Sequence, residues 1–326
     1  MKRRMIITYG IFIGIITVTA MFVSPSFAAQ RMLIGSTSAS SSHYGYFVAV
    51  SQVINEKVPG LETSVVETGA TVDNLRRFAR KQIDLGLVTT NVLSQAYYGR
   101  KDFKGRPVKS KLLWVYVIAP QNAIVRKDAG IADLAGLNGK RYNPGLKGSA
   151  TEKTTEAVFE VLGIKPDYVR GSTTDIVSAV KDNHIIGYVK SGAGLKIDAS
   201  SRDIATFTPI DILSLSKDQT GRIQSQLPEV SIVHVPAGAG PGIGSYTTWG
   251  FAVGCSASLD LDEETAYKIV KAICEDKTIQ ASAMASVKGA NFVEMTLKYA
   301  TSPLHPGTIK YFKEIGASIP DRLIAK

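Results

Sequence analysis

The sequence has 326 residues, of which 44% are hydrophobic, 20% are charged and 8% are aromatic. This balance is that of an ordinary globular protein, and it excludes intrinsic disorder, a collagen helix and a long coiled coil. The length suggests about two domains, each able to bury a sizeable core. Lysine and arginine number 38 against 28 acidic residues, which gives a net charge of +10. Two cysteines and four histidines leave little material for a metal cluster, so we expect no metal and no cofactor.

Residues 1–28 have the pattern of a secretory signal peptide. Residues 2–4 are basic, Ile6–Val23 is an apolar run, and Ser26 and Ala28 are small residues that precede the expected cleavage site. An uncleaved transmembrane anchor is the alternative, because the apolar run is nearly long enough to span a bilayer. Cleavage would remove the three basic residues and lower the net charge from +10 to +7.

A signal peptide of this kind predicts a periplasmic protein. The remaining lysines and arginines are scattered and lack interleaved aromatic residues, so a nucleic acid is not an expected partner. A mild positive field is instead suited to attracting a small anion.

Apolar runs of strand type alternate with amphipathic helical runs, an order typical of an α/β domain with a largely parallel sheet. In the first half we expect strands at Met32–Ile34, Thr63–Glu67, Ile83–Val88 and Leu112–Ala119, and helices at Tyr44–Lys57 and Thr71–Arg80. In the second half we expect strands at Lys140–Tyr142, Asp167–Val169 and Ile185–Val189, and helices at Thr151–Leu162 and from about Ser172. Further helices are predicted at Glu263–Lys277, Ala281–Tyr299 and Tyr311–Gly316. The repeated scheme indicates two lobes of similar construction.

The usual motifs of catalysis, nucleotide binding and metal binding are missing from the sequence. Gly238–Gly244 looks like a dinucleotide loop, but it contains Pro241 and no amphipathic helix follows it. The four histidines are far apart and show no ligand spacing. Cys255 and Cys274 either pair in an oxidising compartment or remain as buried thiols.

Serine, threonine and glycine gather where predicted strands give way to helices. The clusters are residues 35–42, 68–71, 148–151 and 171–174. A helix N-terminus offers unpaired N–H groups and a partial positive charge, which suit a carboxylate or a phosphate. In open α/β sheets such junctions face the ligand crevice. The alternative for each junction is ordinary helix capping, as in the capping box that Ser149 and Glu152 predict.

Basic residues near these junctions are candidate partners for a carboxylate. They are Lys147, Lys153, Arg170 and Lys190. Lys190 is the strongest candidate, because it stands between an apolar strand and Ser191-Gly192. The alternative for each of them is a solvated surface charge.

Five segments of the chain follow one another in a specific order: Ile34–Tyr44, Glu67–Leu75, Asp84–Asn91, Asn143–Glu152 and Ser302–Gly307. Together they resemble the TAXI-type solute receptors of tripartite ATP-independent periplasmic (TRAP) transporters. The similarity extends from Leu33 to about Gly316.

The resemblance implies an α/β, two-lobed type II periplasmic binding protein fold, in which each lobe has a mostly parallel sheet flanked by helices. Lobe 1 would comprise residues 29–124 and 248–326, and lobe 2 residues 125–247. The ligand would be a small organic acid or amino acid resembling glutamate or 2-oxoglutarate, held in the interlobe cleft. Lobe closure about residues 121–125 and 246–251 would capture it without catalysis. The receptor would then deliver it to a TRAP membrane permease driven by an ion gradient.

Carried over onto matching positions, the resemblance also implies ligand contacts from both lobes. They are Ser36, Tyr44, Thr68, Gly69, Thr71, Thr90 and Asn91 in lobe 1, and Asn143, Gly148, Ser149, Thr151 and Ser191 in lobe 2. The chain departs from the family at His43, where a tyrosine is common, and at Lys190, where many members carry a small residue. Lys190 therefore indicates either an extra carboxylate on the ligand or a surface charge.

Two other functions stay open at this point. The chain is alternatively the binding protein of an ATP-driven (ABC) importer or of a sensor kinase, which the receptor sequence alone does not distinguish. A periplasmic hydrolase that uses a loop serine is the other alternative, although no histidine has an evident partner for it.

Overall fold

The computed structural model describes residues 29–325. The predicted signal peptide therefore lies outside the described residues. Within the part that is described, no helix is long and apolar enough to span a bilayer.

Ten strands of the described chain form one sheet in the order β2-β1-β3-β10-β4-β7-β5-β6, with β8 paired to β4 and β9 paired to β10. The strands are β1 (Gln30–Gly35), β2 (Leu61–Val66), β3 (Leu85–Thr89), β4 (Lys111–Arg126), β5 (Arg141–Asn143), β6 (Asp167–Tyr168), β7 (Gly187–Ser191), β8 (Ile210–Leu213), β9 (Ser231–Val235) and β10 (Tyr246–Ala257). The pairs β1–β2, β1–β3, β5–β6 and β5–β7 are parallel. Strands β4 and β10 run antiparallel to each other and to their other neighbours.

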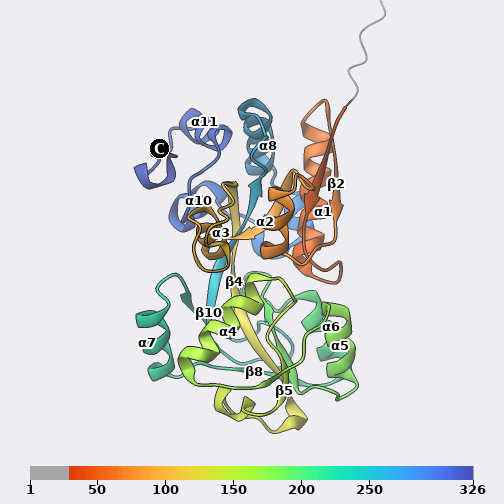
Figure 1. Ribbon diagram of the computed structural model, residues 1–326. Helices are drawn as coiled ribbons and strands as arrows, with labels where there is room; N and C mark the ends of the chain where they lie inside the picture. The colour runs from red at the N-terminus through yellow and green to blue at the C-terminus, as the bar shows by residue number, and fades with distance from the viewer. Residues whose placement is uncertain (1–28, 326) are drawn as a thin grey trace, which may run out of the picture.

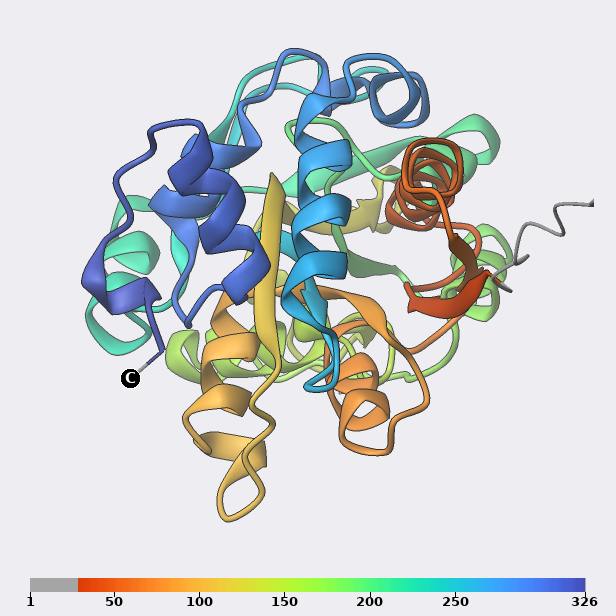
Figure 2. The same ribbon diagram turned by 90° about the horizontal axis from the view of Figure 1, so that it is seen from above.

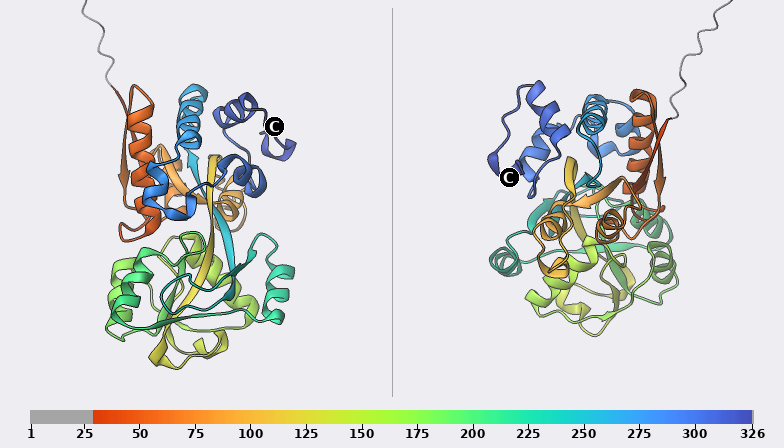
Figure 3. Two further views of the ribbon diagram at one scale, coloured as in Figure 1. Left: turned by 180° about the vertical axis from the view of Figure 1, so that it is seen from behind. Right: turned by 45° about the horizontal axis from the view of Figure 1, so that its top comes forward.

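Strands β4 and β10 are long, and both run from one half of the molecule into the other (Figures 1 and 3). Residues 111–120 of β4 pair with β10, whereas residues 121–126 pair with β7 and β8. Nearly every residue of β4 is buried, as expected for a strand whose two faces are both covered.

The hydrophobic core divides at these two strands. One cluster draws nearly all of its side chains from residues 32–119 and 251–323, and we call this half the first lobe. Two other clusters draw theirs from residues 123–249, and we call this half the second lobe. Both changes of core fall within β4 and β10, so only these strands are shared by the two lobes.

Helices cover the sheet in both lobes (Figure 1). The first lobe carries α1 (Ser42–Lys57), α2 (Thr71–Ala79), α3 (Thr90–Tyr97), α8 (Glu263–Glu275), α9 (Ile279–Ala283), α10 (Phe292–Tyr299) and α11 (Pro306–Glu314). The second lobe carries α4 (Ala150–Leu162), α5 (Thr173–Lys181), α6 (Ala199–Phe207) and α7 (Lys217–Gln226). Seen from above, α8 lies between α1 and α11, which it contacts on either side (Figure 2).

The expected α/β class and two-lobed construction are confirmed, with two differences in detail. Parallel pairing is confined to the outer strands, because the shared strands β4 and β10 are antiparallel. The single helix expected over Ala281–Tyr299 is wrong. Gly289 adopts a positive φ of 73° there, and Asn291 starts α10 anew by accepting hydrogen bonds from the N–H groups of Val293 and Glu294.

One smaller expectation also changed, and one alternative that the sequence left open is decided. The last long helix begins at Pro306 rather than at Tyr311, because His305 caps it and proline suits the first helical position. Cys255, buried in β10, and Cys274, in α8, are both free thiols in the structure.

Candidate functional site

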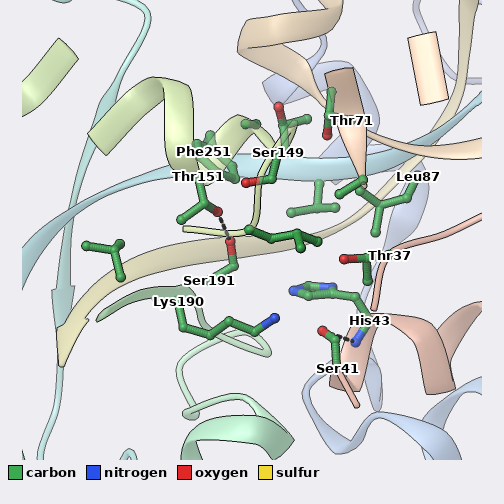
Figure 4. Close-up of a pocket in the computed structure, with 16 residues that line it drawn as sticks. Thr37, Ser41, His43, Thr71, Leu87, Ser149, Thr151, Lys190, Ser191 and Phe251 are labelled. Atoms are coloured by element: carbon green, nitrogen blue, oxygen red, sulfur yellow. Dashed lines mark hydrogen bonds between the residues drawn. The ribbon is translucent and has the colours of Figure 1, made fainter. Parts of the chain in front are cut away.

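A small cavity lies between the two lobes and is walled by both of them (Figure 4). Its lining residues are Thr37, Ser41, His43, Ala70, Thr71, Leu87, Thr89, Leu146, Ser149, Ala150, Thr151, Val189, Lys190, Ser191, Phe251 and Val253. The cavity has a volume of about 40 Å³, which is room for about three water molecules. Seven lining residues carry hydroxyl groups. Of the residues in the described chain that line the wall, Lys190 alone carries a charge at pH 7, and none is an acid.

The first-lobe wall comes from strand ends and helix starts. Thr37 and Ser41 belong to the loop between β1 and α1, and Thr71 is the first residue of α2. Leu87 and Thr89 are two residues apart on β3, so their side chains point to the same face of the sheet. The same alternation places Phe251 of β10 in the wall.

The second-lobe wall is organised by a hydrogen-bond network around Gln121. Thr151 Oγ1 donates to Gln121 Oε1 at 2.8 Å, and Ser191 Oγ donates to the same oxygen at 3.0 Å. Thr151 Oγ1 and Ser191 Oγ also lie 2.8 Å apart (Figure 4). Gln121 sits in β4 where that strand passes between the lobes, so it fixes two lining hydroxyls relative to the shared strand.

Helix α4 begins at the cavity with a capped N-terminus. Ser149 Oγ accepts a hydrogen bond from the N–H of Glu152 at 3.1 Å, as predicted. The reciprocal half of the expected capping box is wrong, because the Glu152 carboxylate accepts from the N–H of Gly148 at 2.8 Å instead. The N-terminal end of α4, with its partial positive charge, therefore faces the cavity beside Ser149.

Two lining hydroxyls lack a hydrogen-bond partner in the part of the chain that the structure describes. Thr71 Oγ1 and Thr89 Oγ1 are both shielded from solvent, and the described residues offer neither of them a partner. Buried polar groups are nearly always hydrogen-bonded, because a buried hydroxyl without a partner lowers the stability of the folded protein. Both hydroxyls belong to cavity-lining residues, and a polar group of a bound molecule would satisfy them.

Lys190 and Asp198 form a buried ion pair beside the cavity. Lys190 Nζ lies 3.6 Å from Asp198 Oδ1, and the side chains are 10% and 0% exposed. Lys190 is therefore not the surface charge that the sequence left as one alternative. Burial on its own would raise the pKa of Asp198, but Lys190 and the hydrogen bonds from Ser200 hold that pKa below its ordinary value.

His43 lies next to this pair and is neutral. Its Nε2 is 3.2 Å from the carbonyl oxygen of Gly192, and its Nδ1 is 2.8 Å from the hydroxyl of Tyr116. Since a carbonyl only accepts, Nε2 carries the proton and Tyr116 donates to Nδ1. Burial is the main cause that lowers the pKa of His43 to about 4; the Lys190 charge lowers it further, and Asp198 opposes both. Both nitrogens of this ring are engaged, so His43 itself is not poised to activate a serine of the cavity wall.

The two lobes are joined directly beside the cavity. Ser41 Oγ and the N–H of Ser42 donate to Asp198 Oδ2 at 2.9 and 2.8 Å, and the N–H of Ala199 donates to Ser42 Oγ at 2.9 Å. The starts of α1 and α6, in different lobes, therefore cap each other across the cleft.

A second hollow of about 220 Å³ lies at the same cleft. Lys101 and Glu229, 2.7 Å apart, and Lys153 and Asp102, 3.3 Å apart, form ion pairs across it from one lobe to the other. We regard the smaller cavity as the candidate site, because the unpaired hydroxyls and the buried lysine converge there.

The structure brings five of the sequence-predicted site residues together in the cavity wall. They are Thr71, Ser149, Thr151, Lys190 and Ser191. These residues come from both lobes, and Figure 4 shows them around one space.

The other predicted site residues are not among those that line the cavity. They are Ser36, Tyr44, Thr68, Gly69, Thr90, Asn91, Asn143 and Gly148. Several shape the loops instead. Thr68 Oγ1 donates to the carbonyl of Ser36 at 2.8 Å, and the amide of Asn143 bonds within its own turn and to Val169. Asn91 Nδ2 donates to Thr154 Oγ1 across the cleft at 3.2 Å and lines the second hollow.

Sequence reasoning missed several lining residues, mostly by one position. Thr37, His43 and Thr89 line the wall where Ser36, Tyr44 and Thr90 were expected. For β3 a signal was present, because Leu87 and Thr89 share a strand face. Asp198 gave no signal, since an aspartate before a helix is an ordinary cap.

The described fold and the sequence both have counterparts among known proteins. A sequence model of the NMT1-like family matches residues 34–316. An ancestral arginine-binding protein bound to arginine is similar in structure, with a TM-score of 0.50 and 14% identity over 83% of this chain and 99% of that one. A putative L-cystine ABC transporter from Listeria monocytogenes has a TM-score of 0.51 and 12% identity over 81% of this chain and 98% of that one. At these identities the structural likeness shows a shared fold, that of periplasmic binding proteins.

Proposed function

The chain belongs to the NMT1-like family, and we propose that it is the solute receptor of a TRAP transporter of the TAXI type. In this proposal it captures a small organic acid or amino acid in the periplasm and delivers it to an ion-gradient-driven membrane permease. It carries out no reaction of its own. The TAXI-like segments of the sequence support the transporter type, and the chemistry of the cavity supports the ligand.

One observation carries the proposal: hydroxyls from both lobes, two of them unpaired, converge with a buried lysine on one interlobe cavity. A carboxylate is a strong acceptor that hydroxyl donors, helix N-termini and a lysine together stabilise. Apolar side chains such as Leu87, Leu146 and Phe251 complete the wall, as is usual for small-molecule sites.

We propose that the ligand is held by lobe closure. Lobe 1 then comprises residues 29–124 and 248–326, lobe 2 comprises residues 125–247, and the hinge lies at 121–125 and 246–251. This hinge falls where β4 and β10 pass from one lobe to the other. The interlobe contacts of Asp198 and Asn91 would form on closure and break on opening.

The proposed ligand contacts fall into two groups. Thr71, Ser149, Thr151, Lys190 and Ser191 would touch the ligand, since they line the cavity. The remaining predicted residues would shape the loops that carry those contacts. Of the residues that sequence reasoning missed, Thr89 is the one we expect to touch the ligand, because its hydroxyl is unpaired.

Small-angle scattering during ligand titration tests the receptor function. Protein refolded without ligand is titrated with small organic acids, and the radius of gyration is followed. We expect one acid to bind and to make the protein more compact. Binding of an acid without any compaction would contradict the closure mechanism.

Transport assays separate the TRAP proposal from its ABC rival. The receptor is combined in vesicles with the permease encoded beside its gene. Uptake driven by an imposed ion gradient without ATP is the expected result. Uptake that requires ATP would assign the receptor to an ABC importer instead.

A further inference from the structure

The Asp198 carboxylate beside the cavity is saturated with hydrogen bonds. Asp198 Oδ2 accepts from Ser41 Oγ and the N–H of Ser42, at 2.9 and 2.8 Å. Oδ1 accepts from the N–H and the Oγ of Ser200, at 3.1 and 2.7 Å. A carboxylate has about four lone-pair positions, so these four hydrogen bonds already fill it. Asp198 is therefore a fixed negative charge at the start of α1.

The filled carboxylate leaves no acidic acceptor for a positively charged ligand group. Asp198 is fully buried, and Lys190 at 3.6 Å already supplies its countercharge. Within residues 29–325, no aspartate or glutamate lines the cavity. An ammonium group entering this space would therefore lose its hydration and meet the like charge of Lys190.

The same pair limits the negative charge that the cavity can hold. Among the residues that the structure describes, Lys190 is the only lysine or arginine in the wall, and Asp198 offsets part of its charge. The N-terminal ends of α2 and α4 add partial positive charges beside Thr71 and Ser149. Together, Lys190 and the two helix ends supply enough positive charge to balance one anionic group. A second carboxylate would face the apolar side chains of Leu87, Leu146 and Phe251.

We propose that the receptor selects a small monocarboxylate without an ammonium group, such as a 2-oxo or 2-hydroxy acid with a short apolar end. This inference rests on the proposed function, which it narrows from acids in general to acids of one charge type. The volume of about 40 Å³ agrees with a ligand of few non-hydrogen atoms. Asp198 is in this account a specificity-determining residue that acts through Lys190.

Matched ligand pairs test the inference by calorimetric titration of the refolded protein. Lactate and alanine differ by a hydroxyl in place of an ammonium group, and 2-oxobutyrate and 2-oxoglutarate differ by a second carboxylate. We expect the first member of each pair to bind at least tenfold more tightly. Equal or tighter binding of alanine or 2-oxoglutarate would overturn the inference while leaving an acid receptor intact. Binding of neutral solutes with no binding of any acid would overturn the proposed function as well.

A substitution at Lys190 gives a second test, in which the protein should gain affinity for a ligand with an ammonium group relative to one without. Replacement Lys190→Met removes the like charge that a ligand ammonium group would meet and leaves the negative charge of Asp198 without its countercharge. We expect Lys190→Met to weaken lactate binding at least tenfold and to tighten alanine binding relative to lactate. Lys196→Met is the matched control, because Lys196 is exposed and bonds the carbonyl of Gly238, and it should leave both affinities unchanged. An unchanged preference in a folded Lys190→Met protein would contradict the role of the pair, and the wild-type ligand pairs decide the question if that variant does not fold.

Discussion

Asp198 lies fully buried where the starts of two helices from different lobes meet. It caps α6, accepts hydrogen bonds from the start of α1 and pairs with Lys190. A single carboxylate therefore couples the interlobe contact to the charge balance of the cavity. Replacing it changes both at once, which makes the residue a sensitive probe.

Asp198→Asn should destabilise the protein strongly. The variant leaves the Lys190 ammonium without its partner and turns one acceptor toward the Ser42 N–H into a donor. Breaking a buried ion pair in this way costs about 3–5 kcal/mol. Urea unfolding measures this loss of unfolding free energy, with Asp203→Asn as the control. Asp203 forms an exposed pair with Lys181, so its loss should cost at most about 1 kcal/mol. Equal losses in the two variants would contradict this account.

His43 predicts a pH dependence of stability. Its pKa is about 4 in the fold against 6.5 for an ordinary histidine. Between these values the unfolded chain binds a proton that the folded chain excludes, so stability falls as the pH is lowered from 6.5 to 4. The loss is about 3 kcal/mol, and it adds to a smaller loss in the same direction from His305, whose pKa is also lowered by burial.

The variant His43→Gln isolates this contribution. A glutamine amide can donate to Gly192 and accept from Tyr116, yet it does not titrate. Unfolding free energies measured from pH 7 to pH 4.5 should therefore fall less steeply in the variant than in the wild type. Parallel pH profiles would show that burial and the Lys190 charge do not hold His43 neutral against the opposing charge of Asp198.

Residues of this kind mark the limit of sequence reasoning at the residue scale. Lys190 stood out because it stands between an apolar strand and Ser191-Gly192, and the structure places it in the cavity wall. Asp198 did not stand out, because a capping aspartate has the same sequence pattern whether or not a distant helix approaches it. Its contacts with Ser41 and Ser42 join residues more than 150 positions apart.

Among the elements, helix α4 offers the clearest test of the site. Ser149 caps α4 at the cavity, and Ser172 caps α5 away from it, each accepting from the N–H three residues on. Ser149→Ala and Ser172→Ala should both cost about 1 kcal/mol of stability. Ligand affinity should fall only in Ser149→Ala, as measured by titration with the same acid. A similar loss of affinity in Ser172→Ala would show that the effect is one of stability.

Most elements were predictable because strand-type apolar runs alternate with helical runs along the chain, as in β3, the first ten residues of β4 and α1. The predictions of helices and of strand faces failed where a residue pattern in the sequence was misread or overlooked. Gly289 and Asn291 break the helix expected over Ala281–Tyr299. Strand alternation in β3 puts Thr89 in the wall, while Thr90 already belongs to α3. A shift of one residue along a strand reverses the face that a side chain occupies.

For the whole molecule, the decisive feature is that β4 and β10 belong to both lobes. Sequence reasoning predicted two α/β lobes, because strand and helix patterns repeat along the chain. It did not predict that the shared strands run antiparallel to their neighbours or which of the four Ser/Thr/Gly junctions converge. Three of them, those of α1, α2 and α4, contribute to the cavity, whereas the junction of α5 does not. Such long-range pairing depends on contacts that no local pattern specifies.

Thermal unfolding of the mature, refolded protein against a panel of small solutes shows whether the interlobe cavity binds a carboxylate. The panel holds mono- and dicarboxylates, amino acids and neutral sugars. A ligand present at 100 times its dissociation constant adds about 2.7 kcal/mol of stability, which raises the unfolding temperature by a few degrees. We predict such a rise with a small monocarboxylate, and its loss in the variant Thr89→Val. A rise with a neutral sugar and none with any acid would contradict the assignment of an interlobe carboxylate site.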